Sequence, residues 1–262
     1  MNSVDSKVPV VYEVQDRVAS ITLNEPDSMN ALSGPLKNAM ASAISRAMDD
    51  PQVRCLLITG VGRAFCAGGD LRTMDERSSQ AVRERMHRSY VWVRQLLCGD
   101  KPVIGAVNGV AAGAGLSLAL LCDVLVASSR ATFTPGFSVI GAAPDLALAY
   151  TLPRAVGIAL AKDMFLTNRR LSAQEALAFG LVSRVVEPEG LQEASRALAL
   201  QVAQGPLSLS LAKGLLNRAF DGGAEAFLER EALSQAAAFN SQDFEEGVRA
   251  FLDKRAPQFR GA

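Results

Sequence analysis

The chain has 262 residues, 49% of them hydrophobic, and its 27 Lys and Arg residues balance its 27 Asp and Glu residues. This length and composition suit a globular enzyme with one large core, and the zero net charge argues against general binding of nucleic acid or of a membrane surface. No apolar run reaches the roughly 18 residues that a membrane helix requires, and residues 1–9 are too polar for a signal peptide, so we expect a cytoplasmic protein.

In the first half of the chain, short apolar runs that suit strands alternate with helical patterns. In chain order we expect strands at 10–14, 18–23 and 53–59, with a helix between Ser33 and Pro51, then a helix at 76–97, a strand at 103–107, a short helix at 113–121 and a strand at 124–127. Pro35, close behind Ser33, is typical of the first turn of a helix. Buried strands that recur between helices favour an α/β fold with parallel pairing.

In the second half the strand signal fades and helices dominate. We expect helices at 146–152 and from Ser172 to Gly180, a last strand at 181–186, and then helices at 191–204, 206–220, 224–239 and 243–255. Ser172 and Glu175 fit a capping box, in which each side chain bonds to the other residue's backbone. The last helices carry apolar residues such as Phe239 and Phe251, which need a surface to pack on, either on the core or on a neighbouring subunit.

Residues that commonly bind metals are scarce in this sequence. His87 is the one histidine, and the four cysteines are scattered without a Cys-x-x-Cys pair. We therefore expect buried thiols, no metal site and no histidine triad.

Two segments of small residues stand at the ends of predicted strands: residues 64–71 (AFCAGGDL) and residues 108–115 (NGVAAGAG). The sequence predicts that each segment opens a helix. Small side chains let a ligand approach the backbone, so that free N–H groups make the contacts. Tight packing of a helix on a sheet also requires small residues, and for a lone glycine it is the favoured explanation. For two matched segments we favour a pair of N–H donors aimed at one oxygen, which is an oxyanion hole.

Several segments resemble the crotonase, or enoyl-CoA hydratase/isomerase, superfamily. They are GRAFCAGGDL (62–71), KPVIGAVNG (101–109), LCDV (121–124) and LSAQEALAFGLVSRV (171–185), and the likeness spans nearly the whole chain. The resemblance implies a ββα-spiral core, which we place at 1–200, and an all-helical trimerisation region at 201–262, in a homotrimer or a dimer of trimers. It also implies an acyl-CoA thioester as the substrate, with no other cofactor, whose carbonyl is held by the backbone N–H groups of Gly69 and Ala114.

The resemblance further implies where the rest of CoA binds. Backbone groups near Ser28, Met29 and Ala67 would hold the adenine. The basic residues Arg72 and Lys254 would meet the phosphates, although an exposed Arg or Lys is usually only a solvated charge. The binding segment that includes Gly69 also contains Asp70 and Leu71, and we expect Asp70 to order the turn through hydrogen bonds to the backbone.

The residue that would move a proton differs from that of the family's hydratases. Those enzymes use two glutamates, and the matching positions here are Ser117 and Phe137, neither of which can act as a base. Asp145 stands where some isomerases of the superfamily, those of the ring-epoxide-CoA type, place their single acid. Apolar neighbours would desolvate this carboxylate and raise its pKa. One carboxylate can remove a proton and return it elsewhere, so the resemblance favours isomerisation of a double bond or of a ring epoxide.

Asp145 also has a structural alternative, because Asp often caps a helix and the predicted helix at 146–152 follows it directly. In addition, Leu146 and Ala147 stand where isomerases of this type commonly carry a Gly-Gly pair. This departure allows for a different substrate or for a loss of activity.

For the acyl pocket we predict Trp92, Ser117 and Phe137. Other apolar residues at helical spacing, Met74, Met86, Tyr90 and Leu96, could line it as well, but such a stripe is more often part of the core. His87 is expected to be a solvated residue at the rim of the acyl pocket. Two other functions stay open: a hydratase or hydrolase that orients water with Asp145 and Ser117, and a non-catalytic protein that binds acyl-CoA.

Overall fold

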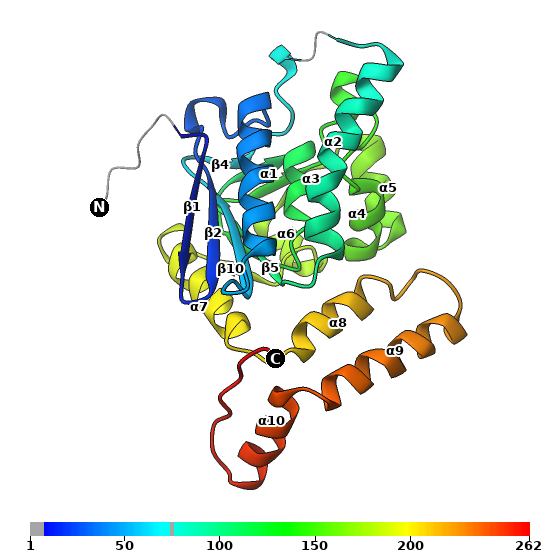
Figure 1. Ribbon diagram of the computed structural model, residues 1–262. Helices are drawn as coiled ribbons and strands as arrows, with labels where there is room; N and C mark the ends of the chain where they lie inside the picture. Colours follow the sequence, from blue (N-terminus) through cyan, green and yellow to red (C-terminus); the bar gives the residue numbers. More distant parts are fainter. Residues whose placement is uncertain (1–7, 74–75) are drawn as a thin grey trace.

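The computed structural model describes residues 8–73 and 76–262, and within them the chain forms two sheets surrounded by helices (Figure 1). The larger sheet has the strand order β1-β2-β3-β5-β7-β10. Its strands are β1 (Val10–Gln15), β2 (Val18–Leu23), β3 (Cys55–Gly60), β5 (Val103–Val107), β7 (Val124–Ser128) and β10 (Arg184–Val186). The β1–β2 hairpin is antiparallel and the other pairs are parallel, which confirms the predicted α/β class.

A smaller second sheet has the order β4-β6-β8-β9 and was not predicted. Its strands are β4 (Ala64–Cys66), β6 (Val110–Ala112), β8 (Thr132–Thr134) and β9 (Leu171–Ser172). β4 and β6 lie inside the two small-residue segments. The second segment opens a helix as predicted, α3 (Ala114–Ala119), whereas the first leads into a 3-10 turn at Leu71–Thr73. Strands of two or three residues show no periodicity, so only their pairing reveals them.

The helices begin within a few residues of the predicted positions, except that α5 was not predicted. They are α1 (Gly34–Asp49), α2 (Ser79–Cys98), α3 (Ala114–Ala119), α4 (Leu148–Val156), α5 (Ile158–Thr167), α6 (Ala173–Ala178), α7 (Leu191–Ala203), α8 (Ser208–Leu216), α9 (Ala224–Phe239) and α10 (Gln242–Leu252). The Ser33 side chain caps α1 by accepting a hydrogen bond from Leu36 N at 3.2 Å. The capping box of Ser172 and Glu175 is confirmed, with both reciprocal hydrogen bonds present.

Two smaller expectations about the chain need correction. The last strand begins at Arg184 and not at residue 181, because Leu181 N and Val182 N donate to Ala176 O in the turn that follows α6. Of the four cysteines, all unbridged, Cys98 is exposed at the end of α2 and not buried.

The central strands of the larger sheet are buried on both faces. Along β3, Leu56 and Ile58 pack into the main core with α1 and α2, whereas Cys55 and Leu57 face a second core under α7. Because alternate residues of the strand face different cores, a slip of one residue would move each side chain to the wrong core. The two cores therefore fix the register of the larger sheet.

The C-terminal helices α8, α9 and α10 extend away from the sheets (Figure 1). The expected boundary at residue 200 lies inside α7, which ends at Ala203 and packs on the larger sheet. Lys213 of α8 anchors this region, because its buried ammonium group contacts the Asp123 carboxylate at 2.8 Å and donates to the carbonyls of Leu96 and Lys101. In the part of the chain that the structure describes, no helix has the length and hydropathy needed to cross a membrane.

Candidate active site

The two small-residue segments lie side by side because they contain neighbouring strands. β4 and β6 are parallel, and Cys66 pairs with Ala111. Gly69 follows Cys66 by three residues, as Ala114 follows Ala111, so both residues lie beyond the same end of the strand pair. A side chain at Gly115 would collide with the Cys66 carbonyl group, which is why this close approach requires glycine.

Each segment contributes to the same cavity a residue, Gly69 or Ala114, whose backbone N–H makes no backbone hydrogen bond among the described residues. Ala114 is the first residue of α3, so its N–H has no acceptor within the helix, and Gly113 before it supplies no side-chain cap. The other segment is held in place by Leu32 N, which donates to Gly68 O at 2.7 Å, while the Gly69 N–H makes no backbone hydrogen bond among the described residues. Two such donors in one cavity are suited to hold a negatively charged oxygen.

The cavity has a volume of about 520 Å³ and is lined from α1, α2, the two small-residue segments and the loop before α4. Gly69, Ala114 and Asp145 line it together, so the structure brings the three predicted catalytic residues into one site. Phe137 and Met86 contribute to its apolar wall. The cavity is large enough for a small-molecule substrate.

Asp145 is half-buried, and its Oδ1 atom is shielded from solvent without a hydrogen-bond partner among the described residues. Burial raises the pKa of this carboxyl group from its ordinary 3.8 to about 6, because the charged form loses its hydration. The positive charges of Lys37 and Arg85 act in the opposite direction and limit the rise of the pKa. A carboxyl group with these properties can accept and return a proton near neutral pH.

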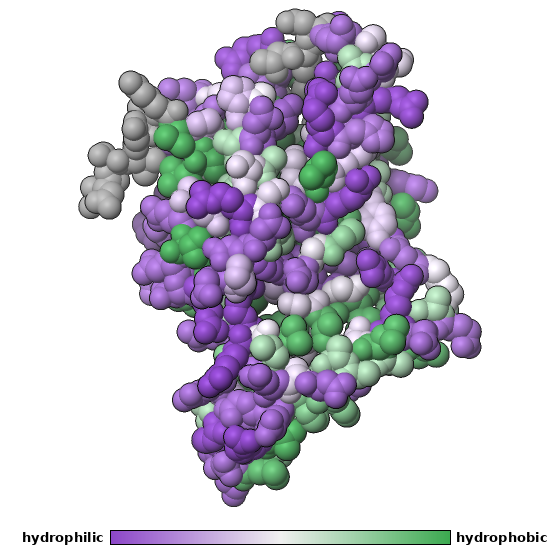
Figure 2. Space-filling model, in the orientation of Figure 1, coloured by the Kyte–Doolittle hydropathy of each residue, from purple (hydrophilic) through white to green (hydrophobic). Residues whose placement is uncertain are grey.

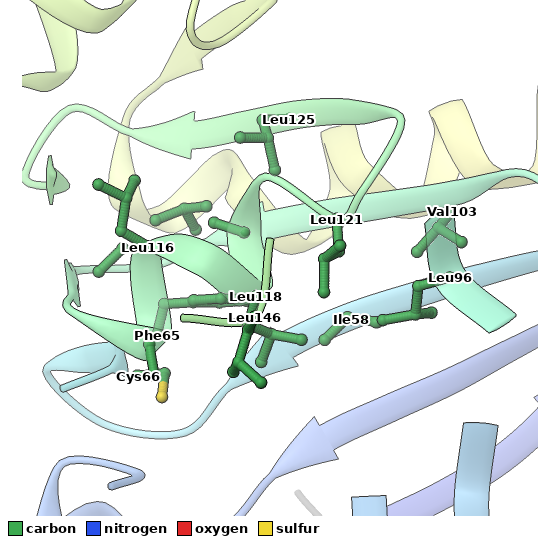
Figure 3. Packing of buried hydrophobic residues seen from close by; sticks show 14 of the residues in the cluster. Ile58, Phe65, Cys66, Leu96, Val103, Leu116, Leu118, Leu121, Leu125 and Leu146 are labelled. Carbon is green, nitrogen blue, oxygen red and sulfur yellow. The ribbon is translucent and has the colours of Figure 1, made fainter. Parts of the chain in front are cut away.

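The backbone turns sharply after Asp145. Leu146 and Ala147 both adopt the left-handed conformation, with φ of 48° and 67°, in the place where glycine would be unstrained. Figure 3 shows Leu146 among the buried side chains of the main core, together with Phe65 and Leu118. Burial of a leucine side chain contributes about 2 kcal/mol, which offsets the cost of about 1–2 kcal/mol for the left-handed conformation.

The alternative role of Asp145 as a helix cap is wrong. α4 begins at Leu148 and not at residue 146, its N-cap is Ala147, and no side chain caps it. Leu148 N donates to the backbone carbonyl of Asp145 at 3.0 Å, which leaves the carboxyl group out of the helix start.

Ser117 connects the acid to the second small-residue segment. Its fully buried hydroxyl group has two backbone acceptors within range, Asp145 O at 3.1 Å and Gly113 O at 3.3 Å. The cavity is lined by Phe137 but not by Ser117. A buried hydroxyl between these two carbonyls is suited to position the turn that carries Asp145.

The remaining residues predicted for the acyl pocket are divided between the core and the cavity. Trp92 and Leu96 are buried in the main core and do not line the cavity. Met86 and Tyr90, from the same helix α2, do line it. Met74 lies outside the described residues. His87 is exposed and lies edge-on to the Tyr90 ring, with 5.8 Å between the ring centroids.

The residues predicted to bind CoA lie around one side of the cavity, apart from Lys254. Ala67 and Leu71 line the cavity along with Gly69, and Ala67 N donates to Met29 O at 3.0 Å, which brings the turn of Ser28 and Met29 next to it. Lys254 follows the end of α10, and in Figure 1 this helix is in the C-terminal region, away from α2 and α3.

Asp70 and Arg72 are bound to each other at the edge of this region. The Arg72 guanidinium group donates to both carboxylate oxygens of Asp70, at 2.9 and 3.1 Å, and Arg72 N donates to Oδ1 at 3.1 Å. The pair holds the pKa of the Asp70 carboxyl group below its ordinary value. The Arg72 side chain remains 77% exposed, so it is accessible to an anionic ligand.

Two residues of the site, Lys37 and Arg85, were missed by sequence reasoning. Lys37 lies on α1 and Arg85 on α2, and both line the cavity. No motif marks them, because each is one basic residue on a partly exposed helix. The packing of α1 beside α2 brings them together near Asp145.

The chain is similar to known proteins over nearly its whole length. Residues 13–262 match the family model described as enoyl-CoA hydratase/isomerase. The 1,2-epoxyphenylacetyl-CoA isomerase of Escherichia coli (strain K12) is 38% identical, over 96% of this chain and 98% of that protein. The 2,3-dehydroadipyl-CoA hydratase of the same organism is also 38% identical, over 96% and 98% of the two chains. A crystal structure of an enoyl-CoA hydratase/isomerase from Cupriavidus metallidurans CH34 matches with a TM-score of 0.91 at 34% identity, over 97% of this chain and 96% of that chain.

Proposed function

Because the chain belongs to the enoyl-CoA hydratase/isomerase family, we propose that it moves a carbon–carbon double bond within an acyl-CoA thioester, with Asp145 as the group that transfers the proton. One observation carries this proposal: Asp145 is the one carboxylic acid among the described residues that line the cavity. Its unpaired oxygen and its pKa of about 6 suit a group that both removes and returns a proton.

In the proposed reaction the thioester carbonyl oxygen accepts hydrogen bonds from Gly69 N–H and Ala114 N–H. The Asp145 carboxylate removes a proton from the α or γ carbon of the acyl chain, and the electron pair moves toward the carbonyl oxygen to give a dienolate. The two N–H groups stabilise this negative charge, and each lowers the activation free energy by about 3 kcal/mol. The Asp145 carboxyl group then returns the proton two carbons away. The atoms balance without water, a metal ion or a redox cofactor.

The surroundings of Ser117 and Phe137 favour isomerisation over hydration. Hydration needs a group that activates water, and the Phe137 ring cannot accept a proton. The Ser117 hydroxyl is fully buried next to the backbone carbonyls of Asp145 and Gly113, so it is poorly placed to orient water in the cavity.

A panel of 2-enoyl, 3-enoyl and ring-epoxide CoA esters incubated in heavy water tests the reaction type. We expect double-bond migration with deuterium at the α or γ carbon and no addition of water. A product heavier by one molecule of water would instead identify a hydratase. Tight binding of the esters without turnover would identify a protein that only binds acyl-CoA.

The role of Asp145 is tested by Asp145→Asn, which keeps the shape of the side chain but removes the base. We expect kcat for double-bond migration to fall about 100-fold or more. Asp49→Asn is the matched control, because Asp49 is exposed on α1 and does not line the cavity. Unchanged migration by the Asp145 variant would rule out its role as the proton carrier.

A further inference from the structure

The cavity contains more positive charge than the proposed proton transfer requires. Lys37 and Arg85 line it together with Asp145, so two cations face one carboxylate. Asp70, the other acid whose charge acts on Lys37, is already bound by the Arg72 guanidinium group. When Asp145 takes up a proton during the reaction, the one negative charge among the described residues that line the cavity is lost.

Among the residues that the structure describes, neither cation has a close hydrogen-bonding partner. The Lys37 ammonium group has no hydrogen-bond acceptor among the described residues, and Arg85 makes one long hydrogen bond, from Nη1 to Glu76 O at 3.4 Å. Burial lowers the pKa of Lys37, and the neighbouring charge of Arg85 lowers it further. A half-buried charge without a partner is costly, so these side chains are arranged for a ligand that is present during catalysis.

We infer that the acyl chain of the substrate carries a carboxylate beyond the reacting carbons, and that Lys37 and Arg85 bind this carboxylate. The inference rests on the proposed function, in which the cavity holds the acyl part of a CoA thioester. The substrate class is therefore an ω-carboxyacyl-CoA. The guanidinium plane of Arg85 suits bidentate binding of a carboxylate, and Lys37 adds a second charge-assisted hydrogen bond.

The position of the two cations favours the acyl chain over the phosphates of CoA. They share the cavity with Asp145 and with the two N–H donors that would hold the thioester. The walls around them include the apolar residues Val82, Met86 and Ile140, which suit an acyl chain better than a hydrated phosphate. A neutral acyl chain in the same place would remove water from both charges without forming hydrogen bonds or ion pairs to replace it.

Binding of saturated CoA esters tests this inference apart from catalysis, because these esters cannot undergo double-bond migration. Calorimetry would compare adipoyl-CoA, its ω-methyl ester and hexanoyl-CoA. We expect the native protein to bind adipoyl-CoA about tenfold or more tightly than the other two esters. In Lys37→Met and Arg85→Met this preference should fall about tenfold, with hexanoyl-CoA bound as well as before or better.

Two controls separate a specific effect from a general one. Arg83→Met removes an exposed cation of α2 that does not line the cavity, and it should leave the preference unchanged. Lys37→Arg retains a positive charge and should retain most of the preference. Thermal unfolding of each variant shows whether it is folded. If Lys37→Met does not fold, Lys37→Arg and Arg85→Met still test the inference.

Equal binding of adipoyl-CoA and its methyl ester by the native protein would overturn the inference. A variant that weakens all three esters alike would also overturn it, because the cation would then contact the CoA moiety. Turnover of the unsaturated esters distinguishes this failure from failure of the proposed function. Migration in neutral esters without preference refutes only the inference, whereas selective binding of the acid without migration in any ester refutes only the isomerase.

Discussion

The Asp145 carboxyl group is subject to two opposing influences. Loss of hydration raises its pKa from 3.8 to about 6, while Lys37 and Arg85 favour the charged form. Without the two cations, burial would keep the Asp145 carboxyl group protonated to a higher pH. A smaller fraction of it would then be ionised at neutral pH and able to act as the base. The basic residues therefore support proton transfer as well as the binding that we infer for them.

This environment predicts a pH dependence. The carboxylate is the form that removes the first proton, so kcat/KM for double-bond migration should rise with pH through about 6 and then level off. Lys37→Met removes a charge that favours the carboxylate, so the midpoint should move to higher pH. Rates between about pH 5 and 8 check both expectations. A profile that falls with rising pH through this range would contradict Asp145 as the base.

The turn from Asp145 into α4 combines a strained backbone with a buried anchor. Leu146 is 3% exposed and Ala147 forms the N-cap of α4, and both have positive φ. The buried Leu146 side chain and the hydrogen bond from Ser117 hold the turn from two sides. We attribute the presence of Leu146 and Ala147 in place of a Gly-Gly pair to this anchoring. It reduces the freedom of the backbone and fixes the position of Asp145.

The two residues of this turn should respond to glycine in opposite ways. Ala147→Gly relieves the left-handed conformation and should raise the free energy of unfolding by about 0.5–1 kcal/mol. Leu146→Gly relieves the same strain but loses core burial, so it should lower that free energy by about 2 kcal/mol. Urea unfolding measures both changes. Destabilisation of similar size by both substitutions would show that strain at residue 147 is not relieved by glycine.

The C-terminal region leaves a large apolar surface uncovered. Figure 2 shows apolar side chains gathered over the C-terminal helices, and the most exposed of them are Leu216, Phe220, Phe251 and Leu252. An apolar patch of this kind on a folded chain marks an interaction site. We therefore retain the prediction that the chain forms a trimer or a dimer of trimers through this region.

A charge placed in that surface should disrupt the assembly. Phe251 is 83% exposed on α10, so Phe251→Asp should not disturb the core and should shift the molar mass in solution toward that of one chain. Leu166→Asp is the control, because Leu166 is similarly exposed at 81% but belongs to α5. Light scattering after size-exclusion chromatography measures the mass. A native protein with the mass of one chain would refute the predicted assembly.

Much of the local structure could be predicted because its causes are short-range. Ser33 and the capping box of Ser172 and Glu175 start helices through contacts within one turn, and the predicted helix at 224–239 has the bounds of α9. The crotonase fold followed from motifs spread over the chain and is confirmed by the solved relatives. The resemblance placed the two family glutamates at Ser117 and Phe137 and the single acid of some isomerases at Asp145. Residue chemistry then favoured Asp145, since Ser117 and Phe137 cannot titrate in the useful range.

Contacts between distant segments determined the rest. The pairing of β4 with β6 places Gly69 beside Ala114, and neither strand is long enough to carry a periodic pattern. Lys37 and Arg85 resemble ordinary surface cations until α1 packs against α2 and partly buries both beside one carboxyl group. Local sequence patterns predict burial and turns. The cavity and its excess positive charge arise only where separate elements meet, because desolvation and electrostatic interaction depend on distances in space.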